Sequence, residues 1–294
     1  MKLRMAIALA LTALVAAAAP KAALDTAKIE ALTGATGKLD EQEGVFRVAV
    51  PRTDLEIEVN SVKLPATMGL TSWVGFKRAG TQTVMTGELA LVQDQVNLVL
   101  DVVLDQKLEV TALHDHFFWD RPRLLFLSLS GAGDETQLAT AVGKVFQKVK
   151  QTSGGNGQIP VISFDPAEGA LDSKKIDAVL GKTGTLDGGV YKLSFPRTAR
   201  IHGEPLGAAM GVGSWAAFSG TDDAAIVDGD LALLESELQG ALKALRASGL
   251  YIVAIHQHFS GENPRLVSVH FWGVGPTAKL AGGIKAALDV QSRR

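Results

Sequence analysis

The chain has 294 residues, of which 47% are hydrophobic and 20% are charged, and its net charge at pH 7 is −2. This length fits one large domain or two smaller ones. The near balance of charge argues against a nucleic-acid partner, because such partners select basic surfaces. The chain contains no cysteine, which excludes disulfide scaffolds, thiolate metal sites and cysteine nucleophiles.

The first 23 residues have the three-part pattern of a secretory signal peptide. Lys2 and Arg4 precede an uncharged apolar run at residues 5–19, and small residues fill positions 16–23. The apolar run is shorter than the roughly 20 residues that a membrane-spanning helix needs. We therefore expect residues 1–23 to be removed on export to the periplasm, with no stable membrane span afterwards.

The rest of the chain contains two similar segments, an internal sequence repeat. Residues 112–133 match residues 254–275 at 9 of 22 positions with a constant offset of 142, where chance gives about one or two matches. Such self-similarity is the signature of a duplicated module. We predict repeat copy 1 at residues 24–150 and repeat copy 2 at residues 171–294, joined by a glycine- and proline-containing linker at residues 151–170.

Each copy combines helices and strands without strict alternation, which predicts an α+β fold, a duplicated module of antiparallel strands with helices packed on the sheets. Asp25 and Asp172 are expected to cap an opening helix, and alternating polarity predicts strands at 45–50 and 55–59. The remaining predicted elements are a helix, two strands and a helix, at 93–106, 109–116, 123–130 and 135–149 in copy 1 and at 235–247, 251–258, 265–272 and 276–288 in copy 2.

Three of the six histidines fall on one predicted hairpin in copy 2. His256 and His258 are two residues apart on the first strand, so both should project from one face about 7 Å apart. If the numbers of paired residues in the hairpin have an even sum, His270 on the second strand joins them, with Cβ atoms about 4.5–8 Å apart. Three imidazoles so placed can bind one ion at about 2.0–2.1 Å.

We predict a metal site made by these three histidines, with His202 as a flanking ligand and Glu262 as the catalytic group that moves a proton. Nitrogen ligands with a carboxylate suit zinc, copper, iron or nickel better than calcium or magnesium. In the alternative interpretation, the histidines are structural and orient Arg265 and nearby backbone groups by hydrogen bonds.

Copy 1 has a matching segment with one difference. His114-Asp115-His116 corresponds to the histidine pair of copy 2, but Ser128 stands in the place of the third histidine. Copy 1 should therefore bind metal weakly or not at all, unless Asp115 or Asp120 supplies an oxygen ligand.

Arg197 and Arg265 each follow a proline, as Arg52 and Arg123 do in copy 1. Such arginines can hold a carboxylate or phosphate with two parallel hydrogen bonds, which makes them candidates for binding a small anionic ligand. Ion pairs that hold a turn to the sheet are the alternative.

Two further features recur in both copies. Trp73 and Trp215 each follow a serine and are expected to anchor the core. The segment containing Asp228 and Asp230 is interpreted as a turn, with an acid at a pocket edge as the alternative.

Taken together, these motifs resemble the LppY/LpqO family of exported bacterial proteins, built around a domain of unknown function. The resemblance rests on Gly69–Trp73 with Gly213–Phe218, on His256-Gln257-His258, and on Asn263-Pro264-Arg265 with His270–Gly273. It covers nearly the whole chain after the signal and implies export and duplication, but no reaction.

Three functions remain open on the sequence. The first is an exported metal-binding protein with the histidine site in copy 2, with metal-assisted hydrolysis or redox chemistry if it is an enzyme. The second is a non-enzymatic module that binds an envelope component or a small anion. The third is a structural envelope protein whose histidines pack and form hydrogen bonds.

Overall fold

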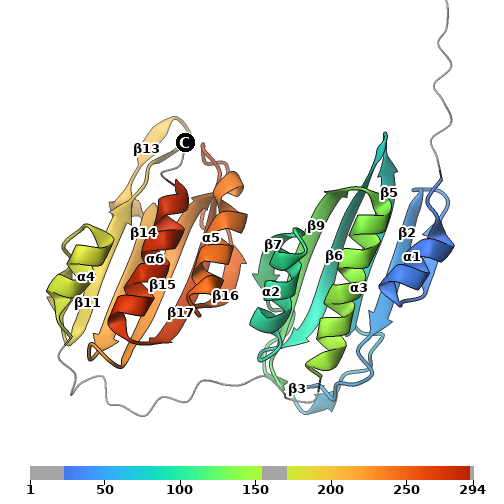
Figure 1. Ribbon diagram of the computed structural model, residues 1–294, viewed down its shortest axis with the longest axis horizontal. Coiled ribbons are helices and arrows are strands. Elements are labelled where there is room, and N and C mark those ends of the chain that lie inside the picture. Colours follow the sequence, from blue (N-terminus) through green and yellow to red (C-terminus); the bar gives the residue numbers. More distant parts are fainter. Residues whose placement is uncertain (1–22, 154–170, 292–294) are drawn as a thin grey trace, which may run out of the picture.

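A computed structural model describes residues 23–153 and 171–291 (Figure 1). The expected signal peptide, apart from Ala23, and all but the first three residues of the expected linker lie outside these ranges. Within the described part of the chain, no helix is both long enough and apolar enough to cross a bilayer.

Copy 1 opens with a capped helix and ends with a long one. The Asp25 carboxylate accepts a hydrogen bond from the Lys28 backbone N–H at 3.0 Å, which confirms the predicted N-cap. Its elements are α1 (Thr26–Thr33), β1 (Gly37–Asp40), β2 (Val45–Pro51), β3 (Glu58–Val59), β4 (Val62–Lys63), β5 (Thr71–Ala79), β6 (Gln82–Val92), α2 (Val96–Asp105), β7 (Glu109–His114), β8 (Asp120–Arg121), β9 (Leu124–Gly133) and α3 (Glu135–Gln151).

Copy 2 has the same order except that it adds a 3₁₀ helix and lacks a counterpart of β8. Asp172 caps its first helix by accepting from the Lys174 backbone N–H. Its elements are α4 (Ser173–Leu180), β10 (Thr185–Asp187), β11 (Val190–Pro196), β12 (Ala199–Ile201), β13 (Glu204–Leu206), the short 3₁₀ helix η2 (Ala208–Met210), β14 (Gly213–Gly220), β15 (Ala225–Leu234), α5 (Glu235–Ala247), β16 (Tyr251–His256), β17 (Leu266–Gly275) and α6 (Thr277–Gln291).

One antiparallel sheet of twelve strands runs through both copies. Its order is β1-β2-β5-β6-β9-β7-β16-β17-β15-β14-β11-β10, so each half presents the same sequence of equivalent strands outward from the centre. Helices and antiparallel strands in a duplicated arrangement confirm the predicted α+β class. The two copies are continuous at β7 and β16 rather than separate.

The helices of both copies cover the same face of the sheet (Figure 1). Beneath them, residues of the inner strands form one large apolar core that spans both copies. The opposite face carries a small apolar cluster in each copy, around Ile57 and Phe126 in copy 1 and around Val212 and Leu266 in copy 2. We call this second side the helix-free face.

The two tryptophans lie on the helix-free face, so the prediction that they anchor the core was wrong. Trp73 and Trp215 are only half-buried, because the strand positions on either side of them supply the core residues. Each ring is instead covered by a cation: the Arg47 guanidinium lies 3.9 Å from the Trp73 ring centroid, and the Lys192 amine lies 4.5 Å from that of Trp215.

The predicted strand at residues 55–59 was also largely wrong, because only Glu58 and Val59 are paired in β3. The alternation of apolar and polar residues there serves the small cluster instead, since Ile57 is fully buried in it. Tertiary packing therefore explains the pattern that suggested a longer strand.

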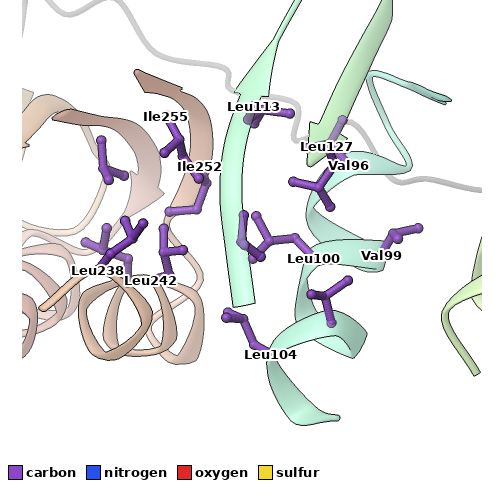
Figure 2. Close-up of a cluster of buried hydrophobic side chains, with 14 of the residues drawn as sticks. Val96, Val99, Leu100, Leu104, Leu113, Leu127, Leu238, Leu242, Ile252 and Ile255 are labelled. Carbon is purple, nitrogen blue, oxygen red and sulfur yellow. The ribbon is translucent and has the colours of Figure 1, made fainter. Parts of the chain in front are cut away.

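The boundary between the copies is built from equivalent residues. Leu113 of β7 pairs with Ile255 of β16, and these two residues differ by the repeat offset of 142. Both side chains are buried in the shared core with Leu100 and Leu242 of the covering helices (Figure 2). We call this boundary the seam.

Two side-chain amides bridge the seam in matching ways. Asn97 accepts from the Ile252 backbone N–H at 2.8 Å and donates to the Ile252 carbonyl at 3.0 Å. Gln239, which occupies the equivalent position in copy 2, does the same with Val110 at 3.0 and 2.8 Å. The two copies therefore meet through a pseudo-two-fold contact of the kind seen in symmetric dimers.

Candidate metal centre

The hairpin of copy 2 brings His270 to the same face as His256. In the pairing of β16 with β17, Ala254 lies opposite His270 and His256 lies opposite Ser268, so the sums are even as the sequence analysis required. His256 and His270 are thus diagonal neighbours. Their ring centroids are 5.0 Å apart and their planes differ by 9°.

His258 reaches the group from outside the strand. The strand β16 ends at His256, two residues earlier than predicted, and His258 lies in the bend that follows. The bend nevertheless turns its ring toward the others, with centroids 4.9 Å from His256 and 6.0 Å from His270. One nitrogen from each of the three rings lies within 4.8 Å of the other two.

A buried carboxylate lies beside this group. Asp230 on β15 pairs directly with His270 across the strands, and its Oδ2 lies 3.5 Å from the His258 Nε2. The residue is only 2% exposed, and its Oδ1 has no hydrogen-bond partner in the described part of the chain. A buried carboxylate oxygen without a partner is costly, so this one is available to a proton or a cation.

Burial changes the pKa values of two groups at this site. Burial raises the pKa of Asp230, and the neighbouring histidines His270, His258 and His256 oppose that effect when they are charged. Burial also lowers the pKa of His256, and the positive charges of His258 and His270 lower it further. The lowered pKa of His256 favours its neutral imidazole, which is the form that binds a metal ion.

The sequence analysis favoured a turn for the segment containing Asp230 and kept an acid at a pocket edge only as the alternative. In the structure Asp230 lies inside the long strand β15. The repeat alignment held the missing signal, since Asp230 and Glu88 are 142 residues apart and both are acids.

The predicted flanking ligand His202 and the predicted catalytic group Glu262 are not members of this group. His202, with φ of 51°, and Gly203, with φ of 85°, form the two-residue turn between β12 and β13, where His202 is exposed and outside the group of three histidines. Glu262 is buried, and its Oε1 accepts a hydrogen bond from the Leu266 backbone N–H at 3.0 Å. That bond closes the turn before β17.

The predicted anion-binding arginines have different surroundings. Arg197 donates to the Glu237 carboxylate at 2.6 and 3.2 Å and to the Ala232 carbonyl at 2.9 Å, so the ion-pair interpretation describes its contacts. Arg265 is exposed on the turn of the histidine hairpin. Its equivalent in copy 1, Arg123, binds the Asp115 carboxylate at 3.2 and 3.0 Å.

Comparison with known proteins adds a family but no activity. The family model described as "Domain of Unknown Function (DUF1259)" matches residues 27–148 and again residues 174–290. A comparison with curated proteins gave no match. A trimeric bacterial microcompartment shell protein, PduB, is 11% identical over 86% of this chain and 89% of its own, with a TM-score of 0.20, and this likeness supports no conclusion about the present chain.

Proposed function

Because the chain belongs to the Domain of Unknown Function (DUF1259) family, whose name carries no reaction, we propose a function from the side chains themselves: binding of a divalent transition-metal ion by His256, His258 and His270. The observation that carries this proposal is the convergence of one nitrogen from each ring within 4.8 Å.

The spacing suits an ion after a small adjustment. Metal–nitrogen bonds of about 2.0–2.1 Å place the nitrogens of one tetrahedral site about 3.3 Å apart. The rings must therefore approach by at most about 1.5 Å from their 4.8 Å limit, a shift that side-chain rotation alone can provide.

The donor set indicates the class of metal. Three imidazoles with a carboxylate favour zinc, copper or iron over calcium and magnesium, which prefer oxygen. Asp230 is the acid beside the rings, 3.5 Å from the His258 Nε2, and it can balance the charge of the ion or orient the ring. Glu262 keeps a positioning role in this proposal, because its carboxylate holds the turn of the same hairpin.

We place this function outside the cytoplasm, in the periplasm, on the basis of the signal-peptide pattern at residues 1–23. The resemblance to the LppY/LpqO family of exported proteins supports the same location.

The test is elemental analysis of the protein purified without a histidine tag and dialysed against zinc, copper or iron(II). The proposal predicts that the double variant His256→Ala/His258→Ala binds one ion fewer per chain than the wild type, while its circular dichroism is unchanged. An equal metal content in the two proteins would refute it. A variant at the exposed His202, His202→Ala, is the matched control and should lose no metal.

Turnover assays separate catalysis from storage. Loss of ester, amide, phosphate or lactone hydrolysis in the same double variant supports a metal-dependent hydrolase. A metal-loaded protein that is inactive on all four substrate classes supports sequestration of the ion.

A second candidate function is the binding of a small anion at Arg265, which the exposure of this guanidinium beside the histidine hairpin favours. Isothermal titration with phosphate and acetate tests it. Arg265→Ala should abolish anion binding and leave the metal content unchanged, whereas equal anion binding by both proteins would refute this candidate.

A further inference from the structure

The geometry points to a second metal site, in copy 1, made by Glu88, His114 and His116. The sequence predicted weak binding or none in this copy, because Ser128 replaces the third histidine. In the structure, the carboxylate of Glu88, on the neighbouring strand β6, lies near the two histidines and can supply the third ligand atom.

The position of Glu88 follows from strand pairing. Glu88 lies directly opposite Ser128 across the β6–β9 ladder, as Asp230 lies opposite His270 in copy 2. Cross-strand partners project from the same face. The serine side chain is short, so it leaves space above the sheet that the longer glutamate side chain can enter.

Three ligand atoms of this site form a small triangle. The His114 Nε2 and His116 Nε2 are 3.0 Å apart, and the Glu88 Oε2 lies 3.6 Å from the first and 3.8 Å from the second. A point equidistant from all three lies about 2.0 Å from each, which is the usual length of a zinc–nitrogen or zinc–oxygen bond. The three distances therefore leave room for an ion that replaces the hydrogen bond between the two rings.

Contacts with neighbouring side chains restrict the rings of His114 and His116. The His116 ring stacks on Phe126, with centroids 3.4 Å apart and planes 10° apart. The Nδ1 atom of His114 is buried and has no hydrogen-bond partner in the described part of the chain. Stacking on Phe126 thus holds the His116 ring, and the hydrogen bond between the two Nε2 atoms joins the His114 ring to it.

The two acids that the sequence offered as substitutes are engaged elsewhere. Asp115 binds the Arg123 guanidinium, and Asp120 accepts a hydrogen bond from the Leu124 backbone N–H at 2.5 Å. Neither belongs to the group of converging atoms. Glu88 is therefore the oxygen ligand of copy 1.

The donor set of copy 1 has one imidazole fewer than that of copy 2. Two imidazoles and one carboxylate leave coordination positions open and suit iron(II) as well as zinc. The side chains of Glu88, His114 and His116 are 23%, 38% and 35% exposed, so an ion and a small ligand can reach them from solvent.

Both sites open on the helix-free face. Leu113 and Ile255 pair at the seam and point into the helix-covered core, so the next residue on each strand, His114 or His256, projects to the other side. Two ions would thus be bound on one side of the sheet, one on each side of the seam.

The competing explanation is that the His114–His116 contact is only a hydrogen bond beside an acid. Titration of the full chain with Co²⁺, followed by visible absorption, distinguishes the two. In the His256→Ala/His258→Ala background, one Co²⁺ per chain should still bind. Adding Glu88→Gln should weaken that binding at least tenfold, because the amide keeps the size but loses the charge. Asp115→Asn is the matched control and should change the affinity less than twofold.

The outcomes are distinct from those of the proposed function. No Co²⁺ binding in the His256→Ala/His258→Ala background would overturn this inference and leave copy 2 untouched. Binding that survives both Glu88→Gln and His114→Ala would overturn it as well. A wild-type protein whose only ion is lost with Glu88→Gln would support copy 1 and refute the site in copy 2.

Discussion

The two copies share one framework and distribute their polar groups differently over it. In copy 2 the third histidine, His270, is present and its cross-strand partner is the short, buried Asp230. In copy 1 that position is Ser128, and its partner is the longer Glu88, which approaches both remaining rings. Where copy 1 lacks the third imidazole, the acid on the neighbouring strand is longer by one methylene.

The repeated arginines show a similar difference between the copies, because their acidic partners come from different positions. Arg52 and Arg197 both donate to the carbonyl of an equivalent residue, Ala90 or Ala232. Arg197 then pairs with the buried Glu237, whereas the equivalent of Glu237 in copy 1 is the neutral Gln95 and the charge comes from Asp54. The guanidinium therefore has an equivalent position in both copies, whereas the carboxylate that pairs with it comes from a different position in each copy.

The largest expected effect comes from breaking the arginine pair of copy 2. Arg197→Ala leaves the 3% exposed Glu237 carboxylate without this cation, which should lower the free energy of unfolding by about 3 kcal/mol or more. Urea unfolding followed by tryptophan fluorescence measures it. A loss below about 1 kcal/mol would show that the pair contributes little.

Exchanging His270 and Ser128 tests whether the residue at this position determines the difference in metal binding between the two copies. His270→Ser should weaken metal binding in copy 2 by about 100-fold or more, since even outer-shell partners of a metal ligand change affinity about 10- to 100-fold. Competition with a chromophoric chelator measures it. The reciprocal Ser128→His should strengthen binding in copy 1, and unchanged affinity in both variants would contradict the comparison.

The symmetry of the seam can be tested with two equivalent substitutions. Asn97→Ala and Gln239→Ala each remove two hydrogen bonds to a strand backbone. Each should cost about 1–3 kcal/mol of unfolding free energy, and the two costs should be similar. The exposed amide variant Gln137→Ala is a control expected to stay within about 0.5 kcal/mol. A large cost for only one seam variant would show that the two bridges are not equivalent.

The smallest expected effect concerns acid stability in copy 1. The Arg52 guanidinium lowers the pKa of Asp54 from 3.8 to about 2. A carboxyl whose pKa is lower in the folded state stabilises the protein above pH 3.8, and this contribution is lost as the pH falls through about 2. The carboxyl is 38% exposed, so solvent screening limits the contribution to under about 1 kcal/mol.

The measurement compares the wild type with Asp54→Asn across this pH range. The difference in unfolding free energy should be constant near neutral pH and disappear toward pH 2. A difference that does not change with pH would mean that the charge of Asp54 adds nothing to stability.

Sequence patterns predicted the duplication and the α+β class. These features depend on local signals such as the N-caps Asp25 and Asp172 and the helix at residues 235–247. The register of the histidine hairpin was only a condition in the sequence analysis, because period-two alternation does not decide whether the sum of paired residue numbers is even; the structure meets the condition with His256 opposite Ser268.

The acids of the candidate sites could not be found in the same way. Asp230 and Glu88 reach the histidines through ladders that join strands distant in sequence, β15 to β17 and β6 to β9. No local pattern reports such a pairing. The half-buried tryptophans were misjudged for a related reason, because the face that a strand turns toward the helices is decided by the whole sheet.

The pairing of Leu113 with Ile255 has one further consequence. A single copy would end in an edge strand whose unpaired backbone groups can hydrogen-bond to another strand. Here that strand is the equivalent edge of the other copy. Two identical subunits joined in this manner must carry identical sites. A single polypeptide that contains both copies removes that restriction, so the residues around the histidines can differ between the halves while the joint between them stays symmetric.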